Sequence, residues 1–176
     1  MPISKYLKHL FMAGIISLTA FNADAQYQSD FKIVKGNNDT EIVYKGTLTF
    51  DDIKSVADFN LVNAANDYKV NEAAVNSLME PLKSYDLVVF LGTWCEDSHR
   101  TIPQLYKVLE LTKYPLSKLT LFGVDREKKT IHDEEAKYDV KLVPSIIVMQ
   151  DGKEIGRITE VVDKSVEQDL LKIIQK

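Results

Sequence analysis

Two short, uninterrupted apolar runs constrain the fold of this chain more than any other feature. The runs are LVVFLG at residues 87–92 and LTLFGVD at residues 119–125. A continuous apolar run of this length is typical of a strand that is buried on both faces. Apolar residues at helical spacing precede, separate and follow the two runs, so strands alternate with helices. This order predicts an α/β fold whose parallel core sheet is covered on both faces.

The other elements follow from hydrophobic spacing and turn residues. Residues 31–50 alternate apolar and polar residues around a Gly-Asn-Asn-Asp turn, which predicts a β-hairpin. Residues 145–159 predict a second hairpin, which turns at Asp151-Gly152 and adds an antiparallel edge to the sheet. Helices are predicted at 67–86, 98–111, 133–140 and 164–176. Pro81 should end or kink the first of these helices.

The first 25 residues have the pattern of a secretory signal peptide. Lys5 and Lys8 flank an apolar run from Leu10 to Phe21, and small residues precede Gln26 at the cleavage positions. The alternative is a membrane anchor, but the run is shorter than the roughly 20 apolar residues that span a bilayer. We therefore expect cleavage before Gln26 and secretion to the periplasm or extracellular space. No stable membrane insertion is expected after cleavage.

Together these patterns divide the chain into three parts: a signal peptide at 1–25, an N-terminal β-rich extension at 26–66, and the alternating domain at 67–176. The whole chain has a net charge of −4, and cleavage would leave about −5. An acidic protein of this kind is not expected to bind nucleic acid. The one dense basic run, at 126–130, is interrupted by Glu127 and is interpreted as a solvated loop or a helix start.

The chain has a single cysteine, Cys95, which follows its single tryptophan, Trp94. Free thiols outside the cytosol tend to be oxidised, so an unpaired cysteine there indicates intermolecular pairing or a reactive thiol. Cys95 lies between a predicted strand and a predicted helix, where reactive groups of α/β sheets collect. Unpaired N–H groups at a helix start also favour the thiolate over the thiol. The alternative is a buried cysteine that only packs.

The segment VVFLGTWCEDSHRTIP resembles the active-site segment of the thioredoxin superfamily. In that family a strand leads into Trp-Cys-x-x-Cys and a proline interrupts the following helix, which Trp94, Cys95 and Pro103 match. The segment LVPSIIVMQDGKEIG resembles the cis-proline segment of the family, with Val143 and Pro144 in the loop. Loops of this kind pack beside the cysteine and pair with the substrate backbone. The resemblance therefore implies substrate binding by Trp94, Val143 and Pro144.

The resemblance covers about residues 80–176 and implies a thioredoxin-like three-layer fold with a mixed sheet, preceded by the N-terminal β extension. Four positions depart from the family pattern. Ser98 replaces the resolving cysteine, and Glu160 stands near a usual glycine. Val89 and Leu121 replace the buried aspartate and its lysine partner. Most of the machinery of an efficient dithiol reductase is therefore missing.

These departures predict monothiol chemistry. Cys95 can attack a disulfide, but a thiol from the substrate or from another molecule must resolve the mixed disulfide. The expected function is therefore thiol–disulfide exchange or isomerisation, with protein or small-molecule thiols and disulfides as partners. Ser98 is expected either to donate a hydrogen bond to the thiolate or to cap the helix. Asp97 and His99 are candidates for tuning the thiol, although an acidic first turn and a surface histidine are also ordinary structural features.

A second function remains open from the residues alone: a redox-inert thioredoxin-fold module that binds an extended peptide along Pro144 and Trp94. Iron–sulfur clusters need several thiolates, and a zinc site needs a Cys/His cluster. The sequence offers neither, so no cofactor and no metal are expected. Replacement of Cys95 by serine separates the two functions, because only the first requires the thiol.

Overall fold

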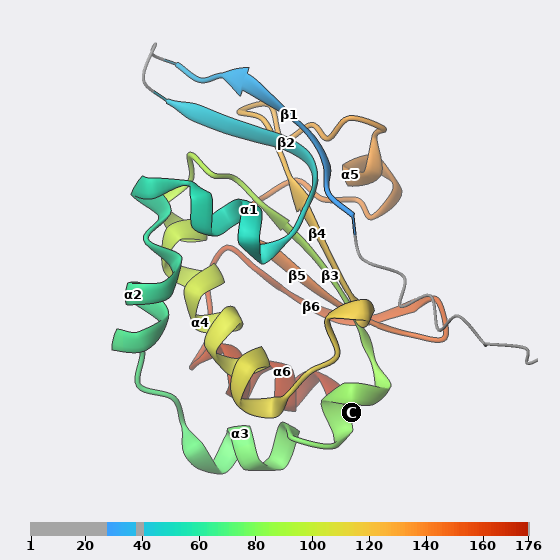
Figure 1. The fold of residues 1–176 in the computed structure, drawn as a ribbon. Coiled ribbons are helices and arrows are strands. Elements are labelled where there is room, and N and C mark those ends of the chain that lie inside the picture. The colour runs from blue at the N-terminus through green and yellow to red at the C-terminus, as the bar shows by residue number, and fades with distance from the viewer. Residues whose placement is uncertain (1–27, 38–40, 176) are drawn as a thin grey trace, which may run out of the picture.

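The computed structural model describes residues 28–37 and 41–175, so the predicted signal peptide at 1–25 lies outside the described residues. One six-stranded sheet has the order β1-β2-β4-β3-β5-β6 (Figure 1). The strands are β1 (Asp30–Lys35), β2 (Ile42–Leu48), β3 (Asp86–Leu91), β4 (Leu119–Gly123), β5 (Ser145–Gln150) and β6 (Lys153–Thr159). Among these described strands, β3 and β4 pair in parallel, and the other neighbouring pairs are antiparallel. The predicted mixed sheet is confirmed, with its parallel core reduced to one strand pair.

Helices cover the two faces of the sheet unequally (Figure 1). The larger group packs on one face: α1 (Phe50–Ser55), α2 (Leu61–Asp67), α3 (Glu72–Leu78), α4 (Glu96–Thr112) and α6 (Val166–Ile174). The other face is covered by residues 124–143, which include the short α5 (Glu134–Lys137). Short 3-10 turns η1 (Ala57–Phe59), η2 (Pro81–Ser84) and η3 (Leu116–Lys118) connect these elements. The fold is therefore the three-layer arrangement that the sequence predicted.

Alternation along β3 explains its uninterrupted apolar sequence. Leu87, Val89 and Leu91 are buried in the core beneath the larger helix group. Val88 and Phe90 are buried in the second core on the opposite face. Because successive side chains of a strand point to opposite faces, a strand covered on both faces needs apolar residues at every position.

Both predicted hairpins are confirmed. Asp30↔Thr47 through Lys35↔Ile42 pair in the first, and β5 pairs with β6 in the second. Asp151 and Gly152 have φ values of 51° and 75°, as a tight two-residue hairpin turn requires. The first hairpin continues the central sheet, because β2 pairs with β4. The division of the chain at residue 67 stays a prediction.

The region between β2 and β3 differs most from the sequence expectation. The structure places α1, η1 and α2 within residues 50–67, where the sequence patterns predict no helix. Thr49 and Asp52 form a reciprocal capping box at the start of α1. The single helix predicted at 67–86 is shorter, because Asn71 caps α3 and η2 begins at Pro81. Short helices of one or two turns carry too little periodicity to be detected reliably from sequence.

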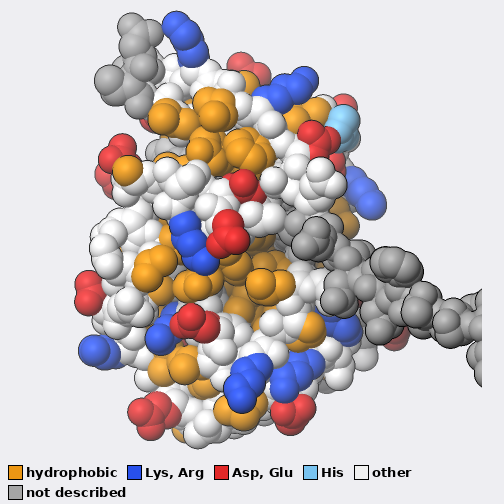
Figure 2. Space-filling model, viewed as in Figure 1, with side chains coloured by type: hydrophobic (Ala, Val, Ile, Leu, Met, Phe, Trp, Pro, Cys, Tyr) orange, Lys and Arg blue, Asp and Glu red, His pale blue; other side chains and the backbone are white. Residues whose placement is uncertain are grey.

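On the face shown in Figure 2, groups of hydrophobic side chains are exposed between Lys, Arg, Asp and Glu side chains. Such exposure is normal, since apolar atoms form much of any folded surface. Among the helices that the structure describes, none combines the length and apolar character that a membrane crossing requires.

Candidate active site

Cys95 occupies the N-cap position of α4, immediately after the loop that follows β3. Its backbone is extended (φ −101°, ψ 120°), and its N–H donates to the Gly92 carbonyl at 3.0 Å. The thiol makes no capping hydrogen bond to the helix. Instead, Sγ donates to the carbonyl oxygen of Val143 at 3.4 Å. The Val143–Pro144 bond is cis, so the predicted cis-proline loop is confirmed and lies beside the cysteine.

The position of Cys95 gives its sulfur two distinct neighbours. The first is the start of the 17-residue helix α4, where backbone N–H groups without intrahelical partners attract negative charge. The second is the Val143 carbonyl oxygen, which accepts a hydrogen bond from the thiol but would repel an anion. The side chain is only partly buried. The sulfur therefore lies between a helix start and a carbonyl oxygen, with access to solvent.

Trp94 is held against the end of β4. Its indole Nε1 donates to the Val124 carbonyl at 2.9 Å, and the ring packs on the second core. Gly92 lies beneath the side chains of Trp94 and Cys95. A Cβ added there would lie 2.8 Å from the indole Cε2 and 3.1 Å from the Cβ of Cys95. Only glycine lets the indole and Cys95 approach the backbone this closely.

Ser98, at the position of the resolving cysteine, is fully buried. Its hydroxyl oxygen accepts a hydrogen bond from the Gly92 N–H at 3.1 Å. Among the described residues, no hydrogen bond joins Ser98 to Cys95. The structure thus assigns Ser98 a supporting contact to the loop, and its catalytic role stays a prediction.

The two candidates for tuning the thiol make their contacts elsewhere. His99 Nε2 lies 2.7 Å from the Thr93 carbonyl, and its ring packs on Phe59 at a centroid distance of 4.4 Å. Because a carbonyl can only accept, Nε2 carries a proton in this contact. Asp97 pairs with Arg100 at 2.9 Å, and both side chains are well exposed. Any influence of Asp97 or His99 on Cys95 would therefore act through space rather than through a described hydrogen bond.

Thr93 connects the N-terminal hairpin to the active-site loop, the segment at 92–95 that follows β3. The sequence did not reveal this connection. Its buried hydroxyl donates to the Ile42 carbonyl at 3.0 Å and accepts from the Tyr44 N–H at 3.1 Å. Both partners belong to β2, about fifty residues earlier in the chain. No local pattern around a threonine can indicate such a distant pair of contacts.

Arg126 is the second residue that sequence reasoning missed, because residues 126–130 were interpreted as solvated or as a helix start. The guanidinium carbon lies 4.7 Å from the centroid of the Trp94 ring, and the Lys128 Nζ lies 6.0 Å from it. Arg126 also forms a two-pronged ion pair with Glu41. The hydrogen bond to Glu41 raises the pKa of Arg126 above its ordinary value, and the negative charges of Glu41 and Cys95 add to this effect.

The two substituted proton-transfer positions are apolar neighbours in the sheet. Val89 pairs directly with Leu121, and both are buried. Neither side chain can ionise, so this part of the core holds no proton near the thiol. Val89 and Leu121 therefore cannot supply the proton transfer that the aspartate and lysine provide at these positions in the family pattern.

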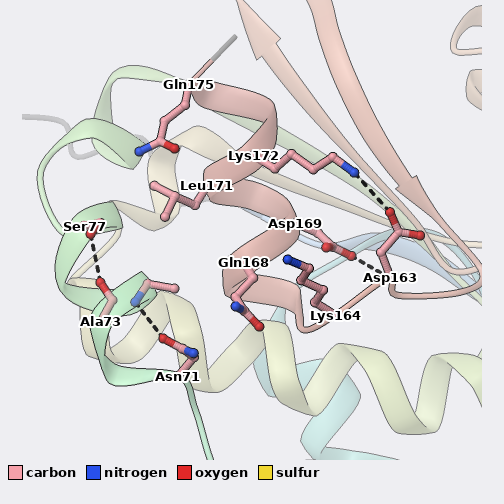
Figure 3. A pocket seen from close by; sticks show the side chains of 11 residues that line it. Asn71, Ala73, Ser77, Asp163, Lys164, Gln168, Asp169, Leu171, Lys172 and Gln175 are labelled. Carbon is pink, nitrogen blue, oxygen red and sulfur yellow. Dashed lines mark hydrogen bonds and ion pairs between the residues drawn. The ribbon is translucent and has the colours of Figure 1, made fainter.

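Two hollows differ in their relation to this site. A cleft of about 360 Å³ borders it, with walls from β2, from α1 to η1, and from Thr93, Trp94 and His99. A larger hollow of about 610 Å³ lies between α3 and α6 and includes none of the predicted site residues (Figure 3). Its polar groups bond locally, as in Asn71 to Ala74 and Lys172 to Asp163. Within the described residues, no group of three or more His, Cys, Asp or Glu is placed to hold a metal ion.

The fold and the Trp-Cys site together define a class of protein. The family model for thioredoxin matches residues 61–176. The chain belongs to the thioredoxin family, as the sequence motifs predicted. Membership supports a thioredoxin-like redox function in general. No curated protein matches the chain.

Several solved structures are similar to parts of this chain. A protein of unknown function from Pseudomonas aeruginosa is 17% identical, with a TM-score of 0.49 over 73% of this chain and 86% of that chain. Thioredoxin O2 from Arabidopsis thaliana is 19% identical, with a TM-score of 0.38 over 59% of this chain and 83% of its own. Mitochondrial thioredoxin 3 from Saccharomyces cerevisiae is also 19% identical, with a TM-score of 0.37 over 59% and 87%. The family assignment rests on residues 61–176 rather than on these distant likenesses.

Proposed function

We propose that this protein is an extracytoplasmic monothiol member of the thioredoxin family, which acts through Cys95 in thiol–disulfide exchange or isomerisation. The observation that carries the proposal is the position of the sulfur. It lies at the N-cap of α4, partly accessible, and 3.4 Å from the carbonyl that precedes the cis proline. A cysteine with only a packing role has no need of this position.

The first step is attack of the Cys95 thiolate on one sulfur of a partner disulfide. A bond forms between the two sulfurs, the original S–S bond breaks, and the second sulfur of the partner leaves as a thiolate. The helix start favours the attacking anion before this step. In this proposal the proton of Cys95 passes to water, since Val89 and Leu121 supply no acceptor and the side chain is partly open to solvent.

The second step requires an external thiolate, since the chain has no other cysteine. The thiolate attacks the partner's sulfur in the mixed disulfide, and Cys95 leaves as the restored thiolate. If the attacking group is another thiol of the same partner, the net result is disulfide isomerisation. If it is a separate small thiol, the net result is exchange. No net oxidant or reductant is consumed in the isomerisation route.

The proposed partners are protein or small-molecule thiols and disulfides in the periplasm or extracellular space. Support comes from the signal-peptide pattern at residues 1–25 and from the redox conditions outside the cytosol, where disulfides persist. Expression with an epitope tag after residue 176, followed by fractionation, tests the location. Recovery of the full-length chain from the cytosol alone would contradict it.

The chemistry is tested with the purified protein and a peptide that contains one strained, mispaired disulfide. We expect an adduct of the peptide on Cys95 by intact mass, and a faster approach to the native pairing when a little free thiol is present. Cys95→Ser should abolish both. Ser117→Ala, on the exposed 3-10 turn η3, serves as the matched control.

The same experiment separates the alternative function. A redox-inert module would bind the peptide equally well through the Pro144 loop in the wild type and in Cys95→Ser, and no adduct would form. Retained binding without any adduct or isomerisation would overturn the exchange proposal.

A further inference from the structure

The loop after β4 presents two cations to the face of Trp94. The guanidinium of Arg126 and the ammonium of Lys128 lie 4.7 Å and 6.0 Å from the ring centroid. Cations at these distances are attracted by the electron-rich face of an indole. The indole itself is fixed by its bond to the Val124 carbonyl. Both positive charges are therefore held beside the active-site segment.

The loop has a defined shape, because the carboxylate of Asp125 organises it. One oxygen accepts the N–H groups of Glu127 and Lys129, each at 2.9 Å. The other oxygen pairs with Lys45 of β2 at 2.6 Å. Lys128 adopts a left-handed conformation with φ 61° and donates its N–H to the Asp125 carbonyl. The direction in which Arg126 and Lys128 leave the loop is therefore set by backbone contacts.

Two observations relate the Trp94 ring and Arg126 to Cys95. The Cβ that glycine lacks at position 92 would meet both the Trp94 ring and Cys95, so the two side chains converge over one backbone position. In addition, the negative charge of Cys95 is among the groups that raise the pKa of Arg126, after the hydrogen bond and charge of Glu41. Arg126 thus interacts electrostatically with Cys95, and both cations lie on the ring of the residue next to it.

Negative charges near the site offset part of the positive charge of Arg126 and Lys128. Glu41 pairs with Arg126, and Asp97 pairs with Arg100. Glu96 is exposed beside Cys95. Lys128 has no ion pair among the described residues. It therefore supplies positive charge that no carboxylate of the described chain neutralises by contact.

We propose that Arg126 and Lys128, held on Trp94, give Cys95 a preference for disulfides flanked by negative charge, and that its partner is a peptide or protein disulfide with an acidic residue beside the reactive cysteine. This proposal rests on the proposed function, because it names the substrate class of the same thiol. Arg126 and Lys128 are specificity-determining residues: they attract the neighbouring carboxylate, and the sulfur exchange itself is unchanged.

The test compares three small disulfides of similar size: dithiodipropionate, which is anionic, 2-hydroxyethyl disulfide, which is neutral, and cystamine, which is cationic. The measured quantity is the rate of adduct formation on Cys95 by intact mass at low ionic strength. We expect the order anionic, neutral, cationic in the wild type. Lys128→Gln and Arg126→Gln should each lower the anionic-to-cationic ratio about twofold to fivefold. About 0.5 M salt should compress the ratio in the wild type.

Two variants serve as controls. Arg126→Lys keeps the positive charge and should keep most of the anionic-to-cationic ratio, in contrast to Arg126→Gln. Lys153→Gln removes an exposed charge at the turn between β5 and β6, at the far end of β5 from Pro144, and should leave the ratio unchanged. If Arg126→Gln does not fold, Lys128→Gln decides alone, since Lys128 takes no part in the Glu41 contact. An unchanged ratio in Lys128→Gln would overturn the proposal.

A parallel reaction distinguishes failure of this proposal from failure of the proposed function. Iodoacetate, which is anionic, and iodoacetamide, which is neutral, alkylate thiols without any disulfide. Suppose that no disulfide reacts but the iodoacetate-to-iodoacetamide ratio still falls in Lys128→Gln. The exchange function would then be wrong, while the electrostatic preference at Cys95 would stand. Equal alkylation ratios in wild type and variant would overturn the preference itself.

Discussion

The indole Nε1 of Trp94 donates a hydrogen bond to the Val124 carbonyl at 2.9 Å, which joins the loop after β3 to the end of β4. The same indole converges with Cys95 over Gly92. Since the chain has one tryptophan, its fluorescence reports on this one place. The reporter and the sulfur of Cys95 thus belong to adjacent residues with fixed geometry.

We therefore predict that formation of a mixed disulfide on Cys95 changes the intensity of tryptophan fluorescence in the wild type, because a new group is placed beside the indole. Stopped-flow fluorescence after mixing with an excess of disulfide measures this directly. The same reagent should give no change with Cys95→Ser. A change of equal size in that variant would mean that the signal arises from non-covalent binding.

Ser98→Ala should lower the free energy of unfolding by about 1–3 kcal/mol, because it leaves the buried Gly92 N–H without its acceptor. Chemical denaturation measures the loss. Ser117→Ala, at an exposed position, should change the free energy by less than about 0.5 kcal/mol. A neutral Ser98→Ala would show that the hydroxyl is not needed to hold the loop.

Ser98→Cys is expected to restore the missing half of dithiol chemistry. A thiol at this position corresponds to the resolving cysteine of the family, so an internal disulfide with Cys95 should form under mild oxidation. Mass spectrometry would detect the loss of two hydrogens, and reduction would reverse it. Persistence of two free thiols under oxidant would indicate that the loop of this chain cannot adopt the disulfide geometry.

Thr93→Val should destabilise the protein by about 1–3 kcal/mol, since the Tyr44 N–H loses its buried acceptor and the Ile42 carbonyl its donor. Hydrogen exchange at Tyr44 should accelerate more than exchange in β5. Thr47→Val, a β2 threonine without a described side-chain hydrogen bond, is the matched control. Equal effects of the two substitutions would show that the bridge between β2 and the active-site loop contributes nothing specific.

Glu135 should make the stability of the fold depend on acid. Burial alone raises its pKa, but hydrogen bonds from Thr130 and Lys129 outweigh burial and lower the pKa from 4.5 to about 2. A group with a lowered folded pKa stabilises the protein above its unfolded pKa. This contribution, up to about 3 kcal/mol, should be lost as the pH falls from about 5 to 2.

Denaturation of wild type and Glu135→Gln across this pH range measures the effect. Wild type should be the more stable protein at pH 7, and the gap should close toward pH 2. Asp51→Asn, an exposed carboxylate in α1, controls for the general effect of charge removal. A constant gap at every pH would show that ionisation of Glu135 contributes nothing to folding.

The sequence predicted the central elements because each of them carries a local signal. The run at 87–92 indicated β3, and Asp151-Gly152 indicated the second turn. The spacing of Trp94, Cys95 and Pro103, together with the cis-proline segment, indicated the family. The cis bond at Pro144 and its contact with the cysteine followed from the resemblance. In each case neighbouring residues, or a motif with fixed spacing, were sufficient.

The environment of the site could not be predicted in the same way. Thr93 acts through β2, and Arg126 acts through Glu41 and Trp94, all distant in sequence. These contacts depend on the strand order β2-β4-β3, which brings the first hairpin beside the active-site loop. The short helices α1 and α2 escaped detection because they are too brief to show a period. The contacts of Thr93 and Arg126 therefore come from the tertiary arrangement of the strands, which residue type alone does not indicate.

The pairing of β2 with β4 has a practical consequence for the part of this chain that matches the family model. The family match begins at residue 61, but residues 46–48 occupy the hydrogen-bonding edge of β4. A fragment trimmed to residues 61–176 would expose that edge as an open template for other strands. We expect such a fragment to aggregate on expression. We therefore predict that the chain cannot be cut at the start of the family match without loss of a soluble fold.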